Sequence, residues 1–135
     1  MNKPVRYVAT ALITQNDKIL ICQRPSHKGN ALKWEFVGGK TEKGETLQQA
    51  LVRECREELD VGIEVGEKII SVTHEYPDII AKITMFSARI TEGTPEMLEH
   101  VDMKWIKASE IDDFDFCVAD TAILEKVKAL MNNLS

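Results

Sequence analysis

Hydrophobic and polar residues alternate along several stretches of this 135-residue chain. Alternation with a period of two, in segments rich in Val, Ile and Thr, is typical of half-buried strands. A turn at 15–17 between two such segments predicts a hairpin near the N-terminus, and Pro77 marks the turn of a second one. The predicted strands cover residues 7–14, 18–23, 34–37, 61–65, 68–75, 79–90 and 101–106.

Two other stretches carry apolar residues at the spacing of an amphipathic helix. The first begins at Thr46 and runs to about Leu59. Thr46 and Gln49 have the form of a capping box, in which each side chain satisfies a free backbone N–H at the helix start. The second stretch covers 119–134, and a short helical turn is expected at 108–111. Helices among strands of mixed order predict a layered α/β/α sandwich.

The first helix has an unusual charge pattern in its second half. At about 100° per residue, Glu54, Glu57 and Glu58 project on or beside its apolar stripe, while Arg53 faces outward. Like charges at this spacing oppose helix formation by roughly 0.2–0.5 kcal/mol per pair, and one arginine does not neutralise the set. A divalent cation, which tolerates crowded carboxylates, explains the pattern. A charged, solvated helix face is the alternative.

Composition and charge indicate a globular protein and argue against some classes of binding partner. Residues 1–135 have the length of a single domain, and 44% hydrophobic with 29% charged residues is ordinary for a globular protein. No apolar run approaches a membrane span, and the three widely spaced cysteines read as reduced core thiols of a cytoplasmic protein. A net charge of −5 argues against binding to nucleic-acid polymers or to an anionic membrane.

The segment from Gly39 to Val61 resembles the signature of the Nudix hydrolases, G-x5-E-x7-R-E-U-x-E-E-x-G-U, where U is aliphatic. The matching residues are Gly39, Glu45, Arg53, Glu54, Cys55, Glu57, Glu58 and Val61. Asp60 replaces the glycine of the signature, a change that should affect local stability and not metal binding, because Asp tolerates a left-handed conformation. The preceding segment, residues 34–40, is similar to the MutT branch of the family.

This resemblance implies a Nudix-type α/β/α sandwich with a mixed central sheet and a site for Mg²⁺, with Mn²⁺ able to substitute. The implied metal ligands are the Gly38 carbonyl, Glu54, Glu57, Glu58 and Glu99. Arg53 would orient the acids, and Glu54 or Glu99 would accept a proton from the attacking water. Glu99 lies outside the signature, where a solvated loop acid is the alternative. Glu45 supports the loop or interacts with the helix dipole.

The resemblance also implies a substrate site. Arg24 and Lys40 match basic positions that face the nucleotide, although either is also compatible with an ordinary surface charge. Phe36 is expected near the base or in the core. Asp120 matches a base-reading position, and its carboxylate suits a base with an amino group, such as cytosine. Capping of the last helix is the alternative for Asp120. The three histidines, including His100, are expected to face solvent.

The implied activity is hydrolysis of a nucleoside triphosphate to the monophosphate and diphosphate, on CTP or dCTP, including modified cytosine, or on an oxidised purine such as 8-oxo-dGTP. The protein would act as a monomer or homodimer. One alternative is a Nudix hydrolase of another nucleoside diphosphate derivative, such as a nucleotide sugar. A non-catalytic nucleotide sensor is the other, although such a module needs no cluster of acids that activates water.

Overall fold

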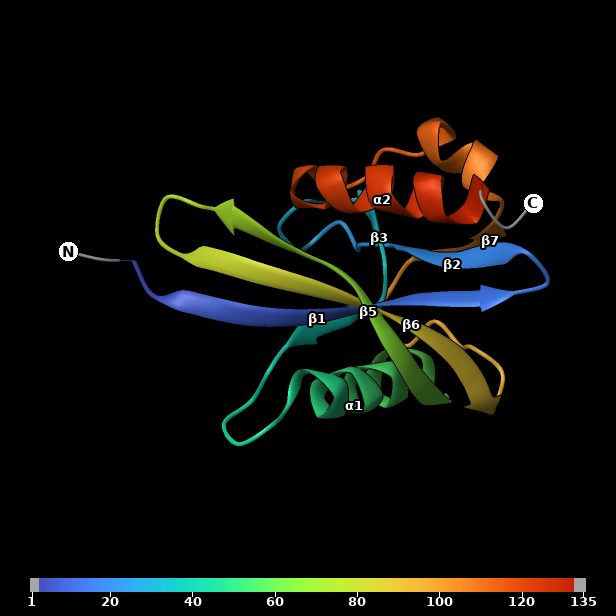
Figure 1. The fold of residues 1–135 in the computed structure, drawn as a ribbon, viewed down its shortest axis with the longest axis horizontal. Helices are drawn as coiled ribbons and strands as arrows, with labels where there is room; N and C mark the ends of the chain where they lie inside the picture. The colour runs from blue at the N-terminus through green and yellow to red at the C-terminus, as the bar shows by residue number, and fades with distance from the viewer. Residues whose placement is uncertain (1–2, 133–135) are drawn as a thin grey trace.

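The computed structural model describes residues 3–132, and a seven-stranded sheet forms its centre (Figure 1). The main strand order is β3-β2-β1-β6-β5, with β4 paired to β1 and β7 paired to β2. Their bounds are β1 Val5–Gln15, β2 Lys18–Gln23, β3 Trp34–Glu35, β4 Gly38–Lys40, β5 Gly62–Glu75, β6 Ile80–Glu92 and β7 Asp102–Ile106. The β1–β6 pair is parallel and the other strand pairs are antiparallel, which confirms the predicted mixed sheet.

Two helices, α1 (Leu47–Leu59) and α2 (Thr121–Asn132), cover opposite faces of this sheet (Figure 1). Strand β1 shows why two cores result, because its successive side chains point to opposite faces. Ala11 and Ile13 pack in one cluster with Leu51 of α1, whereas Leu12 packs in the other with Ile123 of α2. Both clusters are buried, and the predicted α/β/α sandwich is confirmed.

The ends of α1 follow from local sequence. The Gln49 backbone N–H donates to Thr46 Oγ1 over 3.1 Å, and the Thr46 N–H donates to Gln49 Oε1 over 2.9 Å, so the predicted capping box is present. At the other end Asp60 adopts the left-handed conformation, with φ 54° and ψ 44°. Its backbone N–H donates to the Arg56 carbonyl at 3.1 Å, which completes the helix terminus.

The strand before the glycine pair was predicted too long, because only Trp34–Glu35 pairs as β3. The Val37 carbonyl instead accepts hydrogen bonds from the Ala11 N–H and from Thr10 Oγ1, so the chain crosses here to β1. The two glycines that follow, Gly38 and Gly39, belong to strand β4, which pairs with β1. Gly38 has φ 154°, and a Cβ there would overlap the backbone of Ala9 and Thr10, so this close approach requires glycine.

Two smaller differences from the predicted elements occur, and one predicted turn is confirmed. The predicted strands 61–65 and 68–75 form one strand, β5, whose pairing with β6 shifts register around Gly66 and Lys68. The predicted last helix begins with a 3-10 turn, η2 (Val118–Asp120), and positions 133–134 lie outside the described residues. The helical turn predicted at 108–111 is the 3-10 helix η1 (Ala108–Asp113). Between residues 3 and 132, no helix is both long and apolar enough to cross a membrane.

The left-handed helix end predicts that Asp60→Gly stabilises the protein. Glycine adopts this conformation without the steric cost of a Cβ, so the free energy of unfolding should rise by roughly 0.5–1 kcal/mol. Urea unfolding followed by tryptophan fluorescence measures the change. Asp60→Ala is the matched control and should lower stability, and equal stability of the two variants would contradict the explanation.

Candidate active site

Arg53 ties the acidic helix α1 to the loop that precedes it. Its Nε donates to Glu45 Oε2 at 2.7 Å, and its Nη1 donates to Glu54 Oε1 at 2.9 Å and to Glu57 Oε2 at 3.2 Å. Its Nη2 also donates to the Lys40 carbonyl at 3.0 Å. The hydrogen bond from Arg53 lowers the pKa of Glu45, which also accepts the Glu42 backbone N–H. Arg53 therefore folds back over the acids, and the expectation that it faces outward is wrong.

Glu58 and Glu54 are acids held partly out of water. The Glu58 side chain accepts the Gly38 backbone N–H at 3.3 Å. Burial, together with the charges of Glu54, Glu35 and Glu99, raises the pKa of Glu58 to about 9. Burial also raises the pKa of Glu54, against the lowering effect of Arg53. Both carboxyls carry an electrostatic cost that a nearby cation would remove.

A cavity of about 290 Å³ is lined by most of the predicted metal ligands. Glu54, Glu58 and Glu99 line it together with Gly38 and Gly39. Glu57 does not line this cavity; its side chain is 52% exposed beside Arg53. The expectation that all three helix carboxylates lie inward is therefore wrong for Glu57.

The donor set fits a hard divalent cation. Within residues 3–132, no three acidic, His or Cys side chains lie close enough to hold a metal ion as they stand. The carboxylates of Glu54, Glu58 and Glu99 nevertheless share one cavity. The charge of Glu99 contributes to the raised pKa of both Glu54 and Glu58, which is the situation that an oxygen-seeking cation relieves. Lys28 Nζ lies 3.9 Å from Glu99 Oε2 at the exposed side of this cavity.

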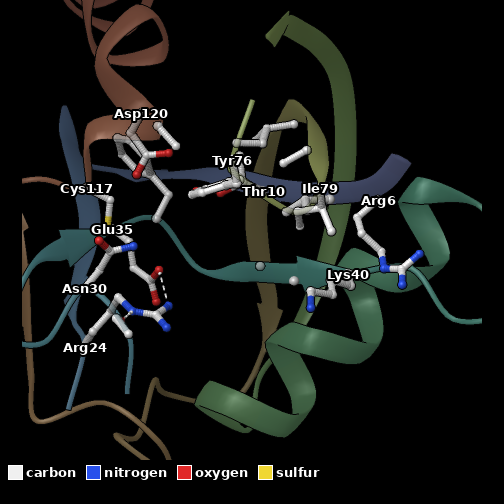
Figure 2. A pocket seen from close by; sticks show the side chains of 18 residues that line it. Arg6, Thr10, Arg24, Asn30, Glu35, Lys40, Tyr76, Ile79, Cys117 and Asp120 are labelled. Carbon is white, nitrogen blue, oxygen red and sulfur yellow. Dashed lines mark hydrogen bonds and ion pairs between the residues drawn. The ribbon is translucent and has the colours of Figure 1, made fainter. Parts of the chain in front are cut away.

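A second cavity, of about 370 Å³, adjoins the first, and the two share the residues Arg24, Glu35, Gly38, Gly39 and Lys40. All four predicted substrate residues, Arg24, Phe36, Lys40 and Asp120, line this larger cavity. Figure 2 shows Glu35 and Asp120 at one end and Arg6 and Lys40 at the other. Phe36 also packs in the core with its ring 5.6 Å from that of Phe116, which confirms the core role considered for it. Its position near the base stays a prediction.

Asp120 is a poor candidate for capping α2. It belongs to η2, and the described part of the chain gives its carboxylate no hydrogen bond from the backbone of α2. Burial and the charge of Glu35 raise the pKa of Asp120 to about 7, against the lowering effect of Arg24. A buried carboxyl that lines a cavity without a protein donor is available to a ligand.

The sequence analysis did not identify Arg6, Glu35 or Tyr76, which line these cavities, and it placed His100 in solvent. Glu35 Oε1 accepts from Arg24 Nη1 at 2.9 Å, and its Oε2 lies 3.0 Å from His100 Nε2. The expectation that His100 faces solvent is wrong, because its side chain is only 3% exposed. The one available signal was an acid between two aromatic residues, at Trp34-Glu35-Phe36.

Comparison with known proteins agrees with this geometry. Residues 8–126 match the family model described as the NUDIX domain. The chain is 37% identical over 123 residues to the CTP pyrophosphohydrolase of Escherichia coli (strain K12), covering 91% of each protein. It is 36% identical over 102 residues to the 8-oxo-dGTP diphosphatase of Proteus vulgaris, covering 73% of this chain and 88% of that protein.

Solved structures show the same architecture. The solution structure of the E. coli ORF135 protein superimposes with a TM-score of 0.81 at 36% identity, covering 95% of this chain and 91% of that one. The crystal structure of the MutT protein from Methanosarcina mazei Go1 gives a TM-score of 0.83 at 22% identity, covering 93% and 94%. This second likeness supports the fold alone.

The packing of Gly39 predicts that Gly39→Ala displaces Glu54 without unfolding the protein. A Cβ at position 39 would lie 2.6 Å from the Glu54 Cδ and Oε1 atoms, which are the flexible end of a side chain and can move. We expect an unfolding midpoint within a few degrees of wild type and a loss of divalent-metal affinity of at least about tenfold. Titration of the protein with Mn²⁺ measures the affinity, and unchanged affinity would show that Glu54 does not bind the metal.

The raised pKa of Asp120 predicts a pH-dependent stability that Asp120→Asn removes. The folded state holds a proton at Asp120 up to a pKa of about 7, whereas the ordinary value of an aspartate is 3.8. Its stabilising contribution is therefore complete below the unfolded pKa and is lost as pH rises through 7. Without ligands, wild type should lose roughly 2–3 kcal/mol more than Asp120→Asn between about pH 5 and pH 8. Urea unfolding at several pH values tests this, and parallel pH profiles would refute it.

Proposed function

Because this chain belongs to the Nudix hydrolase family, we propose that it is a Mg²⁺-dependent nucleoside triphosphate pyrophosphohydrolase. The reaction joins water to a nucleoside triphosphate and releases the nucleoside monophosphate and diphosphate. The relatives named above, a CTP pyrophosphohydrolase and an 8-oxo-dGTP diphosphatase, support this class of reaction.

The observation that carries the proposal is the shared wall between the two cavities. Strand β4 lies between the smaller cavity, which the metal-binding acids line, and the larger one. Its residues Gly38, Gly39 and Lys40 line both. A volume of about 370 Å³ lies within the range of small-ligand sites. A nucleotide placed with its base at the Asp120 end would pass its phosphates over the two glycines, where the absence of side chains permits close approach.

Each group at the junction then has a chemical task. A bound divalent cation would neutralise phosphate charge and lower the pKa of the attacking water. Gly38, Glu54, Glu57, Glu58 and Glu99 supply the oxygen donors for that cation, with Glu57 turning inward from its exposed position. Arg53 fixes the Glu54 carboxylate, and Glu54 or Glu99 accepts the proton of the water. Arg24 and Lys40 contact the phosphates.

Cytidine nucleotides best suit the end of the larger cavity that Asp120 lines. Ionised Asp120 accepts hydrogen bonds and does not donate, which suits the N4 amino group of cytosine. An oxidised guanine is the second candidate, because its ring N–H and amino groups also donate. Uracil and thymine have no exocyclic amino group and would leave a buried acceptor unpaired.

The proposal predicts Mg²⁺-dependent release of diphosphate from CTP or dCTP that Glu58→Gln abolishes. Glutamine keeps the size of the side chain and removes its charge, so kcat should fall at least about a hundredfold while the fold persists. A panel of CTP, dCTP, 8-oxo-dGTP and UTP, compared by kcat/KM for wild type and Asp120→Asn, tests the base. Nucleotide binding without diphosphate release in wild type would establish the sensor alternative instead.

A further inference from the structure

His100 is a buried polar side chain that lines the smaller cavity and that the reaction described above does not use. It precedes β7, and its side chain is only 3% exposed. Its Nε2 lies 3.0 Å from Glu35 Oε2, a contact that spans sixty-five positions of the chain. Within the described part of the chain, no partner reaches its Nδ1. Buried polar atoms nearly always have hydrogen-bond partners, so a buried histidine with one unpartnered nitrogen needs a specific explanation.

The chemistry of the contact fixes which atom donates. An ionised carboxylate has no proton to give, so the proton between the two side chains belongs to His100 Nε2. This nitrogen is thereby committed to Glu35 and cannot accept a proton from substrate water. The other nitrogen is enclosed by protein atoms. His100 therefore has no free, accessible atom with which to act as a general base.

Glu35 connects this histidine to Arg24. Its two carboxylate oxygens serve different donors, His100 Nε2 for one and Arg24 Nη1 at 2.9 Å for the other. Figure 2 shows the contact between Glu35 and Arg24. The Arg24 Nε also donates to the Gly29 carbonyl at 2.7 Å. Two hydrogen bonds thus hold the guanidinium group at the junction of the cavities, and no described residue is bonded to its Nη2.

We infer that His100 is a positioning residue, which fixes the Glu35 carboxylate so that Glu35 in turn aims Arg24 at the phosphates of the bound nucleotide. The inference rests on the proposed function for the identity of the ligand. Arginine binds phosphate best when its planar donors are held in place, because less side-chain entropy is lost on binding. Loss of His100 should therefore weaken binding of the nucleotide more than it slows the chemical step.

Three substitutions of His100 separate this role from simple packing. His100→Phe keeps the ring and removes both nitrogens, and His100→Asn is too short to reach Glu35. His100→Gln places an amide nitrogen about as far from the backbone as Nε2 and can donate to Glu35. With CTP and Mg²⁺, the KM of the Phe and Asn variants should rise about tenfold at nearly constant kcat, and the Gln variant should recover most of the loss.

A double-mutant cycle tests whether His100 acts through Arg24. In an Arg24→Ala background, adding His100→Phe should leave the KM for CTP unchanged, because the group that His100 positions is already absent. Independent, multiplicative effects on KM would overturn the inference. His27→Gln is the control, since His27 is an exposed loop histidine, and it should match wild type throughout.

A measurement without turnover keeps this inference separate from the proposed function. Nuclear magnetic resonance of the Arg24 Nε–H group, in the protein without nucleotide, should show a rigid side chain in wild type and His100→Gln and a mobile one in His100→Phe. Equal rigidity in all three would overturn the role of His100. If wild type hydrolyses no nucleotide while this pattern holds, the proposed function fails and the positioning of Arg24 stands.

Discussion

The candidate site depends on one electrostatic constraint, the packing of several carboxylates against a strand of glycines. Helix α1 directs Glu54 and Glu58 toward β4, where Gly39 lies against the Glu54 carboxylate and the Gly38 N–H faces Glu58. Arg53 makes this arrangement tolerable, because its guanidinium group bonds acids from both the helix and the preceding loop. Burial, with the charges of neighbouring acids, still raises the pKa of Glu54 and Glu58, and a cation would stabilise their ionised forms.

Strand β4 joins these acids to the larger cavity. Because β4 pairs with β1, its two glycines lie between the acids of α1 on one side and the cavity under α2 on the other. Arg24 and Glu35, near the ends of β2 and β3, complete the junction from the neighbouring part of the sheet. The two cavities thus adjoin at the two glycines of β4, which have no side chains to separate them.

The sequence was most informative where the physics is local. The helix start at Thr46 and the strands of both hairpins follow from rules that span a few residues, and the structure has them. The β4 strand was missed because two glycines carry no alternating pattern. The exposure of Glu57 depends on how Arg53 folds over the helix, which periodicity does not specify. His100 was misjudged because its partner, Glu35, lies far away in the sequence.

The parallel pairing of β1 with β6 also determines how late in folding the larger cavity can form. It places Val5 opposite Ile80, whereas the β1–β2 and β5–β6 pairs connect neighbouring segments. Contacts between distant segments require closure of a long loop and are slow to form during folding. The larger cavity takes walls from β1, from β6 and from the residues before α2. A nascent chain or a cleaved fragment that lacks the second hairpin therefore carries the signature segment and its acids without the wall that β6 gives to the larger cavity.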